Sequence, residues 1–426
     1  MIEPSRSPKT LAALGILSAW SALAADTTPP LPTTPPESPW TSSASLTVKE
    51  GYDDNVYLQN IGPNANHGSS ITVVNPNFGL AYQGSPKFGL ALTYAPEFNY
   101  FDAASGEDFT THRVGLTGGG QMGNTGWEVT ESFVGIDGSD IGPTYLQTGG
   151  APANGGPAIR DRRAALIERG RLRMKQSFGN WFIRPVLNGY LHDFLEQHET
   201  TAGYQNFVNR SDINGGADVG WAAIPNTAFV AGYRYGVQSQ DQLFPSINAT
   251  YYDNHYHRLL FGVEGNPWSW LKLNLSLGPE FRHYDGIVAA GFDRTQTYCY
   301  IDSSATITAT KRDTLTLLAI SFEQPGFSGR SAYLDTTLDL TWRHKLSDEW
   351  SIEAGARGWN NDFVNPSADR DDWIVTGKGA VTYTYNKKLS TELAYLYDNA
   401  TSEVANTPAR EYTRQCVMLS LKYVFR

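Results

Sequence analysis

Basic side chains occupy every second position of one short segment: Arg169, Arg171, Arg173 and Lys175. A spacing of two places side chains on one face of a β-strand, so these four charges form a single line. Such a line attracts anions and repels cations, which is the chemistry of an ion-selective surface. On a lipid-facing surface each charge would cost ~2–4 kcal/mol. We therefore expect the line to point into a water-filled interior, where Arg184 of the next segment shares its wall.

Acidic residues of later segments lie on the polar faces of similar alternating stretches: Asp212, Asp218, Glu264, Glu280, Asp302, Asp335, Asp339, Glu353 and Glu392. If the segments close into a ring, they form an acidic wall opposite the basic one, and the field between the walls orients dipolar solutes. Two simpler interpretations stay open. The acidic residues can be the ordinary polar lining of a pore. A shifted register can leave the basic line in an outer loop, since Glu168 falls on its supposed lipid-facing side.

Motifs of catalysis and metal binding are weak in this sequence. It contains no Gly-x-Ser-x-Gly elbow, no His-Glu-x-x-His and no phosphate-binding glycine loop. His255, His257 and His283 could gather at one rim, but scattered rim histidines are commoner than zinc sites. The run from Asp53 to Asn55 could bind calcium, but Asp and Asn at strand ends usually form turns. We predict no catalytic residue, no cofactor and no metal.

The elements that must position the charges are predicted to be β-strands. Phe78, Leu80 and Tyr82 share one face of a segment, and apolar residues again share one face over 88–94. The same period of two recurs along the chain. It gives eighteen strands, with 16 as the alternative, at residues 43–52, 71–83, 88–100, 110–122, 126–137, 163–178, 181–193, 206–222, 227–238, 254–265, 269–284, 296–309, 314–324, 332–344, 349–359, 372–385, 389–398 and 411–425.

The connections between these segments alternate between tight and long. The tight ones, such as Gly179-Asn180, are rich in turn formers, and the long ones are polar. Tight turns at one end and long loops at the other are typical of a membrane barrel. We therefore predict an all-β fold, a closed antiparallel up-and-down transmembrane β-barrel.

Tryptophan placement gives an independent indication of a membrane boundary. Seven tryptophans lie close to tight turns: Trp127, Trp181, Trp221, Trp268, Trp270, Trp342 and Trp350. Indole rings favour the membrane interface, so we predict a tryptophan ring at that end of the barrel. Trp359 and Trp373 flank one long loop and are predicted to belong to a ring at the opposite end.

The first residues have the character of a secretory leader. Arg6 and Lys9 precede an apolar stretch at 11–23 that is too short to span a bilayer as a helix, and small residues follow at 21–24. We predict a signal peptide at 1–24, a proline-rich periplasmic linker at 25–42 and the barrel at 43–426. An uncleaved anchor is the alternative for the first segment.

Bulk composition restricts the class of protein further. The mean hydropathy of −0.37 is compatible with a barrel, because only half of each strand faces lipid. A formal net charge of −10 with no basic domain disfavours nucleic acid as a partner. Cys299 and Cys416 lie in segments far apart, so we expect no disulfide between them.

The opening strand resembles a known family. Tyr52-Asp-Asp-Asn-Val56 is similar to a segment that recurs near the mature N-terminus of the outer-membrane β-barrel porin family, and the overall pattern extends the resemblance over 45–426. This resemblance implies a barrel of porin type, but no particular solute. The secretory leader, together with the alternating connections, predicts a Gram-negative-type outer membrane, and the even number of strands predicts that both termini lie on one side, in the periplasm.

Two further segments resemble features of outer-membrane barrels. The longest connection, Gly138–Arg162, resembles the porin loop that folds inward and constricts the pore, and it carries Asp140, Arg160 and Arg162 near its ends. An exterior loop is the alternative. The last strand, with Tyr423 and Phe425 on one face, resembles the assembly signal read by the barrel-assembly machinery, although Arg426 follows the last aromatic residue.

The expected function is passive diffusion of small hydrophilic solutes across an outer membrane, by a protein that is not an enzyme. Outer-membrane lipid, these solutes and the assembly machinery are the expected partners, and a homo-oligomer is compatible with the pattern. An export or assembly barrel, for example for polysaccharide, is the main alternative. A barrel enzyme acting on lipid is a weaker one, because no obvious Ser–His pair lies on a lipid-facing side.

Overall fold

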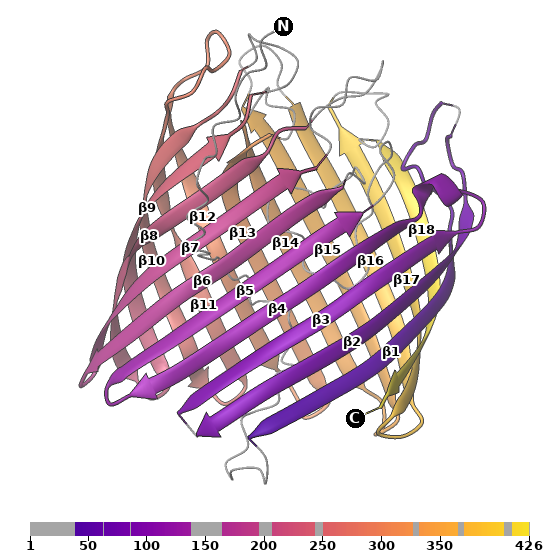
Figure 1. Ribbon diagram of the computed structural model, residues 1–426, viewed down its shortest axis with the longest axis horizontal. Helices are drawn as coiled ribbons and strands as arrows, with labels where there is room; N and C mark the ends of the chain where they lie inside the picture. The colour runs from indigo at the N-terminus through magenta and orange to yellow at the C-terminus, as the bar shows by residue number, and fades with distance from the viewer. Residues whose placement is uncertain are drawn as a thin grey trace, which may run out of the picture.

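The computed structural model describes residues 39–425 except 63, 86, 138–163, 196–206, 243–249, 327–331, 365–369 and 404–410. Its eighteen strands form one antiparallel sheet that closes on itself, so the predicted fold class is confirmed (Figure 1). In this described part no helix is long and apolar enough to cross a membrane. The predicted leader, and the linker up to residue 38, lie outside the described residues.

The strands are β1 (Trp40–Asp53), β2 (Ser69–Ser85), β3 (Phe88–Phe101), β4 (Phe109–Met122), β5 (Thr125–Asp137), β6 (Ala165–Phe178), β7 (Trp181–Phe194), β8 (Arg210–Ile224), β9 (Thr227–Gln240), β10 (Asn254–Trp268), β11 (Leu271–Tyr284), β12 (Thr295–Thr308), β13 (Asp313–Pro325), β14 (Ala332–Lys345), β15 (Trp350–Val364), β16 (Arg370–Thr384), β17 (Leu389–Ser402) and β18 (Tyr412–Val424). One helical turn, η1 (Ser105–Glu107), lies between β3 and β4. Several strands extend beyond their predicted ends: β1 begins inside the predicted linker, and β17 continues to Ser402 instead of residue 398.

The outer face of the ring is apolar and the inner face is polar. In β9, Phe229, Tyr233 and Val237 are exposed on the outside, whereas Arg234 and Gln238 are almost fully buried on the inside. A water-soluble barrel would show the reverse pattern. Hydrocarbon is the solvent that matches an apolar outer face, and closure pairs the backbone groups that lipid cannot satisfy.

The two ends of the barrel differ in their connections. At one end consecutive strands are joined by turns of a few residues, and Gly179 adopts a φ of +61° in one of them, a conformation that glycine adopts at little cost. At the other end the connections are longer. β1 begins and β18 ends at the short-turn end, where Figure 1 marks the C-terminus.

The ring closes where β1 pairs with β18. Asp53 forms an ion pair with Arg414 at 3.4 Å, and both side chains are buried. Asn55 donates from Nδ2 to the Thr413 carbonyl at 2.8 Å. The segment Tyr52–Val56, which carries the family resemblance, therefore fastens the two ends of the sheet together.

Exposed tryptophans lie on the outer face at the short-turn end. The rings of Trp181 and Trp221 stack at 6.0 Å between centroids, and those of Trp268 and Trp270 at 5.4 Å. The prediction for Trp359 was wrong, because this residue is 1 % exposed and belongs to a buried cluster. Nearness to a long loop does not decide which face of the strand a residue occupies.

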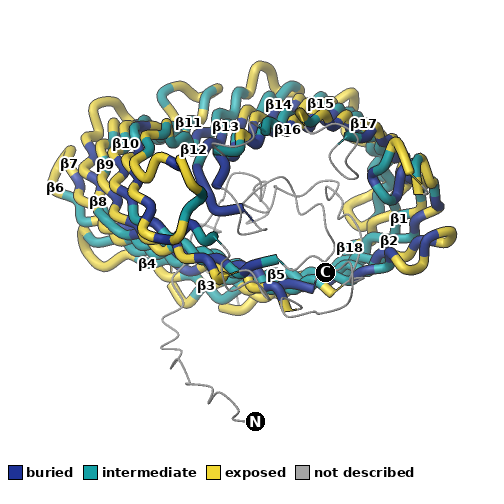
Figure 2. Tube along the Cα trace, turned by 90° about the horizontal axis from the view of Figure 1, so that it is seen from above, coloured by how far each residue is buried: buried dark blue, intermediate teal, exposed yellow. Residues whose placement is uncertain are grey.

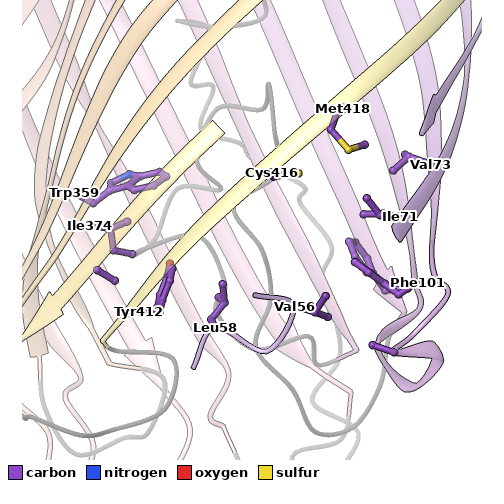
Figure 3. Packing of buried hydrophobic residues seen from close by; sticks show 13 residues of the cluster. Val56, Leu58, Ile71, Val73, Phe101, Trp359, Ile374, Tyr412, Cys416 and Met418 are labelled. Carbon is purple, nitrogen blue, oxygen red and sulfur yellow. The ribbon is translucent and has the colours of Figure 1, made fainter. Parts of the chain in front are cut away.

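That buried cluster lies inside the barrel at the loop end (Figure 3). Val56 and Leu58, which follow β1, are fully buried and belong to the same cluster as Trp359, Tyr412 and Met418. The chain after β1 thus folds inward and covers apolar inner positions of neighbouring strands. This inward segment narrows the lumen on its side of the barrel.

Candidate functional site

The outer part of β13 leaves the barrel wall and turns into the lumen. Its ladder with β12 ends at the pair Ile301–Ser321, while its ladder with β14 continues to Pro325–Ala332. Seen from above, a buried segment beside β12 and β13 runs into the interior of the ring (Figure 2). In the described part of the chain, the β12 residues before Ile301 pair only with β11.

The sequence of β13 explains this departure, because its polarity inverts along the strand. The first outward positions are Leu315 and Leu317, as lipid contact requires, but the later outward position Glu323 is charged. The inward positions change in the opposite sense, from threonine to Ile320 and Phe322. If the outer part of β13 continued in the wall, the Glu323 carboxylate would face lipid, which is costly. Because this part turns inward, Glu323 instead contacts polar partners.

Side chains of β8, β9 and β11 hold the inward segment. Glu323 pairs with Arg282 of β11 at 2.7 Å, and its carbonyl accepts a bond of 3.2 Å from Gln238 of β9. The Arg210 guanidinium of β8 donates to the Pro325 carbonyl at 2.7 Å. These strands do not neighbour β13 in the sheet, so the contacts cross the lumen and divide it.

A cavity of about 100 Å³ lies between the inward segment of β13 and the opposite wall. Its lining comes from β6 to β10 and from β12 and β13, and combines three basic residues, two acidic residues and several aromatic rings and amides: Arg171, Asn188, Tyr190, Arg210, Ser211, Asp212, Asn214, Gln238, Tyr256, Arg258, Tyr300, Asp302, Phe322, Gln324 and Pro325. We call this cavity the side chamber. Both signs of charge thus meet in one small space.

Asp212 is the hydrogen-bonded carboxylate of the side chamber. It accepts hydrogen bonds from Tyr256 Oη at 2.8 Å, Gln238 Nε2 at 2.8 Å and Asn214 Nδ2 at 3.0 Å. Three donors leave little capacity for a further one. Asp212 therefore orients the side chains around it, and it fixes the shape of this wall.

Arg258 and Asp302 face the side chamber from neighbouring parts of the wall. Arg258 is bound to Glu280 through Nε at 2.7 Å, and its guanidinium carbon lies 3.5 Å from the centre of the Tyr300 ring. Asp302 is acted on by the charges of Arg171 and Arg258, but no described residue donates a hydrogen bond to its carboxylate. Its acceptor oxygens remain available inside the chamber.

The predicted basic residues occupy different surroundings. Arg184 pairs with Asp218 at 2.9 Å and with Glu264 at 2.8 Å, so it lies among acidic residues of β8 and β10. Arg173 pairs with Glu128 at 2.8 Å, and Arg171 lines the side chamber. The other two contact aromatic rings: the Lys175 amine lies 4.1 Å from the centre of the Phe182 ring, and the Arg169 guanidinium carbon lies 5.3 Å from the centre of the Tyr190 ring. On this part of the wall, opposite charges are interleaved between strands.

Apart from Asp302, the predicted acidic residues are also found in pairs and polar contacts. Glu280 binds Arg258 and Arg282, and Asp339 binds Arg357. The remaining contacts are Glu353 with Arg343 and Lys378, Asp335 with Gln324, and Glu392 with Thr382. A role of any of these residues in lining a conducting path stays a prediction.

Sequence reasoning missed four inward arginines on the supposed acidic strands: Arg210, Arg234, Arg258 and Arg282. They recur at equal intervals along the sequence, one on each strand from β8 to β11. This regular spacing was the signal that could have identified them. With them, the wall from β8 to β11 carries both signs of charge.

Other predicted features have separate outcomes. The segment 138–162, with Asp140, Arg160 and Arg162, lies outside the described residues. Tyr423 and Phe425 are exposed near the end of β18, with ring centroids 4.9 Å apart. Among the described residues, no group of three or more histidine, cysteine or acidic side chains is arranged to hold a metal ion.

Known proteins provide a partial match to this chain. Residues 305–425, from β12 to the end of β18, match the family model described as "Putative beta-barrel porin 2". No curated protein matches the sequence.

Solved structures match nearly the whole length. OmpTdeltaL8, a loop deletion mutant of an outer membrane protein of Vibrio cholerae, is 11% identical with a TM-score of 0.39, and the match covers 91% of this chain and 100% of that one. OccK2 of Pseudomonas aeruginosa is 11% identical with a TM-score of 0.44, covering 90% and 98%. OccAB3 of Acinetobacter baumannii is 10% identical with a TM-score of 0.41, covering 90% and 99%.

These TM-scores are low, so the identification depends on the chain's own barrel and on the family match. An apolar outer face on a closed ring requires a membrane, and the family match covers the strands of the C-terminal part. The match agrees with the overall porin-like pattern, but it does not include the first strand, so the resemblance of the segment Tyr52–Val56 stays a prediction. The chain is an outer-membrane β-barrel whose last strands are similar to the family described as "Putative beta-barrel porin 2".

Proposed function

We propose that this protein is a passive channel for small hydrophilic solutes. The observation that carries the proposal is the polar inner face of a closed eighteen-strand ring, shown by buried residues such as Arg234, Asp218 and Gln238. A ring of this size encloses water instead of a packed core. Polar side chains around water stabilise hydrated solutes and disfavour apolar ones.

Two inward segments support a limit on solute size. The chain after β1 places Val56 and Leu58 inside the ring on one side, and the outer part of β13 enters it on the other side. Both reduce the cross-section near the loop end. The channel is therefore proposed to pass small solutes and to exclude folded proteins and long polymers.

The short-turn end is proposed to face the periplasm, with outer-membrane lipid around the ring. Barrels of this class have short periplasmic turns and longer outer loops. The exposed pair Trp268 and Trp270 then lies at the periplasmic interface. Folding is proposed to depend on the barrel-assembly machinery, and the proposed activity needs neither a cofactor nor catalysis.

Single-channel recording of the purified full chain in planar lipid bilayers tests this function. Discrete conductance steps, with swelling of vesicles in small sugars but not in large dextrans, are the expected result. A folded protein that gives neither steps nor swelling would contradict the proposal. Heat-modifiable migration on a gel establishes that the tested protein is folded.

A further inference from the structure

We propose that the side chamber is a binding site for a small zwitterion of the amino acid type, occupied during passage through the channel. This inference deepens the proposed function and rests on it. The chamber lies between the inward part of β13 and the wall from β6 to β10.

Unsatisfied acceptors indicate what one end of the ligand must supply. No described residue donates to the Asp302 carboxylate, and Asn188 Oδ1 is buried without a hydrogen-bond partner. A buried acceptor without a donor, such as Asn188 Oδ1, is costly, whereas Asp302 is half-buried and its carboxylate lines the chamber. A ligand that carries N–H donors and a positive charge, such as an ammonium group, would satisfy both of them.

The surrounding arginines indicate the other end of the ligand. Arg171, Arg210 and Arg258 all line the chamber. A purely cationic ligand would be repelled by these three charges, and a purely anionic one by Asp302 and Asp212. A zwitterion places its ammonium group near Asp302 and its carboxylate near the guanidinium groups, so that both charges gain an attractive partner in a weakly screened space.

The aromatic residues limit the size of the ligand. Tyr190, Tyr256, Tyr300 and Phe322 contribute rings to the lining. The Tyr300 ring is already covered on one side by Arg258 at 3.5 Å. The chamber therefore suits a compact ligand whose charged groups are separated by only a few bonds, and the rings can contact a short alkyl part.

The test compares glycine with acetate and methylammonium, which each carry one of its two charges. Titration calorimetry on the detergent-solubilised full chain measures binding without requiring conduction, and bilayer recording measures interruption of the ion current. Glycine is expected to bind and to interrupt the current, and the two singly charged compounds are expected to do so much more weakly. Equal binding of acetate would overturn the zwitterion assignment in favour of an anion site, and equal binding of methylammonium in favour of a cation site.

Two variants show whether Asp302 is responsible. Asp302→Asn should weaken glycine binding by about tenfold, because a charged hydrogen bond is lost, and should leave acetate binding unchanged or stronger. Asp348→Asn removes the same charge from an exposed turn at the short-turn end and should leave glycine binding unchanged. Unchanged glycine affinity in Asp302→Asn would overturn the inference. A protein that binds glycine but never conducts would contradict the proposed channel function and leave the binding site standing.

Discussion

Arg282 of β11 and Glu323 of β13 form a buried ion pair at 2.7 Å, although β12 lies between their strands in the sheet. The pair forms because β13 turns inward. Glu323, whose position in the alternation would otherwise point outward, thereby contacts the inner face of β11. Buried ion pairs require further hydrogen bonds to offset desolvation. Tyr284 supplies one by donating to Glu323 at 2.6 Å, and Glu280 also contacts Arg282.

Replacing Glu323 by Gln should release the inward part of β13. Arg282 would lose one of its two carboxylate partners in a buried site, which costs about 3 kcal/mol of the free energy of unfolding. Guanidinium unfolding of the barrel in lipid vesicles measures this loss. Single-channel conductance should increase, because the side chamber and the lumen would merge.

Glu353→Gln is the matched control for that variant. Glu353 pairs with Arg343, whose side chain is 58% exposed, so the pair is screened by water. Its removal should cost less than about 1 kcal/mol. Equal losses for Glu323→Gln and Glu353→Gln would show that the pair with Arg282 does not hold β13 in place.

The strands could be predicted from the sequence because local alternation decides them. In β18, Val417, Leu419 and Leu421 are exposed and Arg414 and Met418 are buried, as period two requires. The turns at the short-turn end can likewise be predicted from a few neighbouring residues. This information suffices for the number, direction and inner face of the strands.

The side chamber could not be predicted from the same pattern. The alternation predicts a strand at 314–324, but its place inside the lumen depends on contacts with Arg210, Gln238 and Arg282, which belong to distant strands. Glu323 is the local sign of this inward turn, because it is a charged residue on the side of the strand where Leu315 and Leu317 face lipid. The interleaved charges around Arg184 depend in the same way on which strands become neighbours.

Asn55→Ala should loosen the junction between the two ends of the sheet. The variant removes the bond to the Thr413 carbonyl at 2.8 Å and the bond that Asn55 Oδ1 accepts from the Gln59 amide at 3.0 Å. Each lost bond costs about 1 kcal/mol. Faster hydrogen exchange at the Thr413 and Gln415 amides, with unchanged exchange in β9, is the expected result. Uniformly unchanged exchange would show that this segment does not fasten β18.

Phe425→Ala should lower the fraction of protein that reaches the folded state in the outer membrane. Phe425 follows the last strand, packs against Tyr423, and its amide donates to the Ala44 carbonyl at 2.8 Å. The proposed assembly signal requires this terminal aromatic ring. Phe78→Ala, another exposed aromatic on the outer face, is the control and should assemble normally. Equal yields of the two variants would show that Phe425 is not part of an assembly signal in this strand.

Replacing Arg169, Arg171 and Arg173 by Ser should shift the reversal potential towards cations in a salt gradient. The three side chains share the inner face of β6, so their removal leaves the lumen more acidic. The shift should shrink as salt shortens the Debye length. Replacing Lys311, Arg312 and Lys387, which lie in short turns outside the strands, removes the same charge and should shift the potential much less. Equal shifts, or none in a folded and conducting barrel, would place the β6 arginines outside the permeation path.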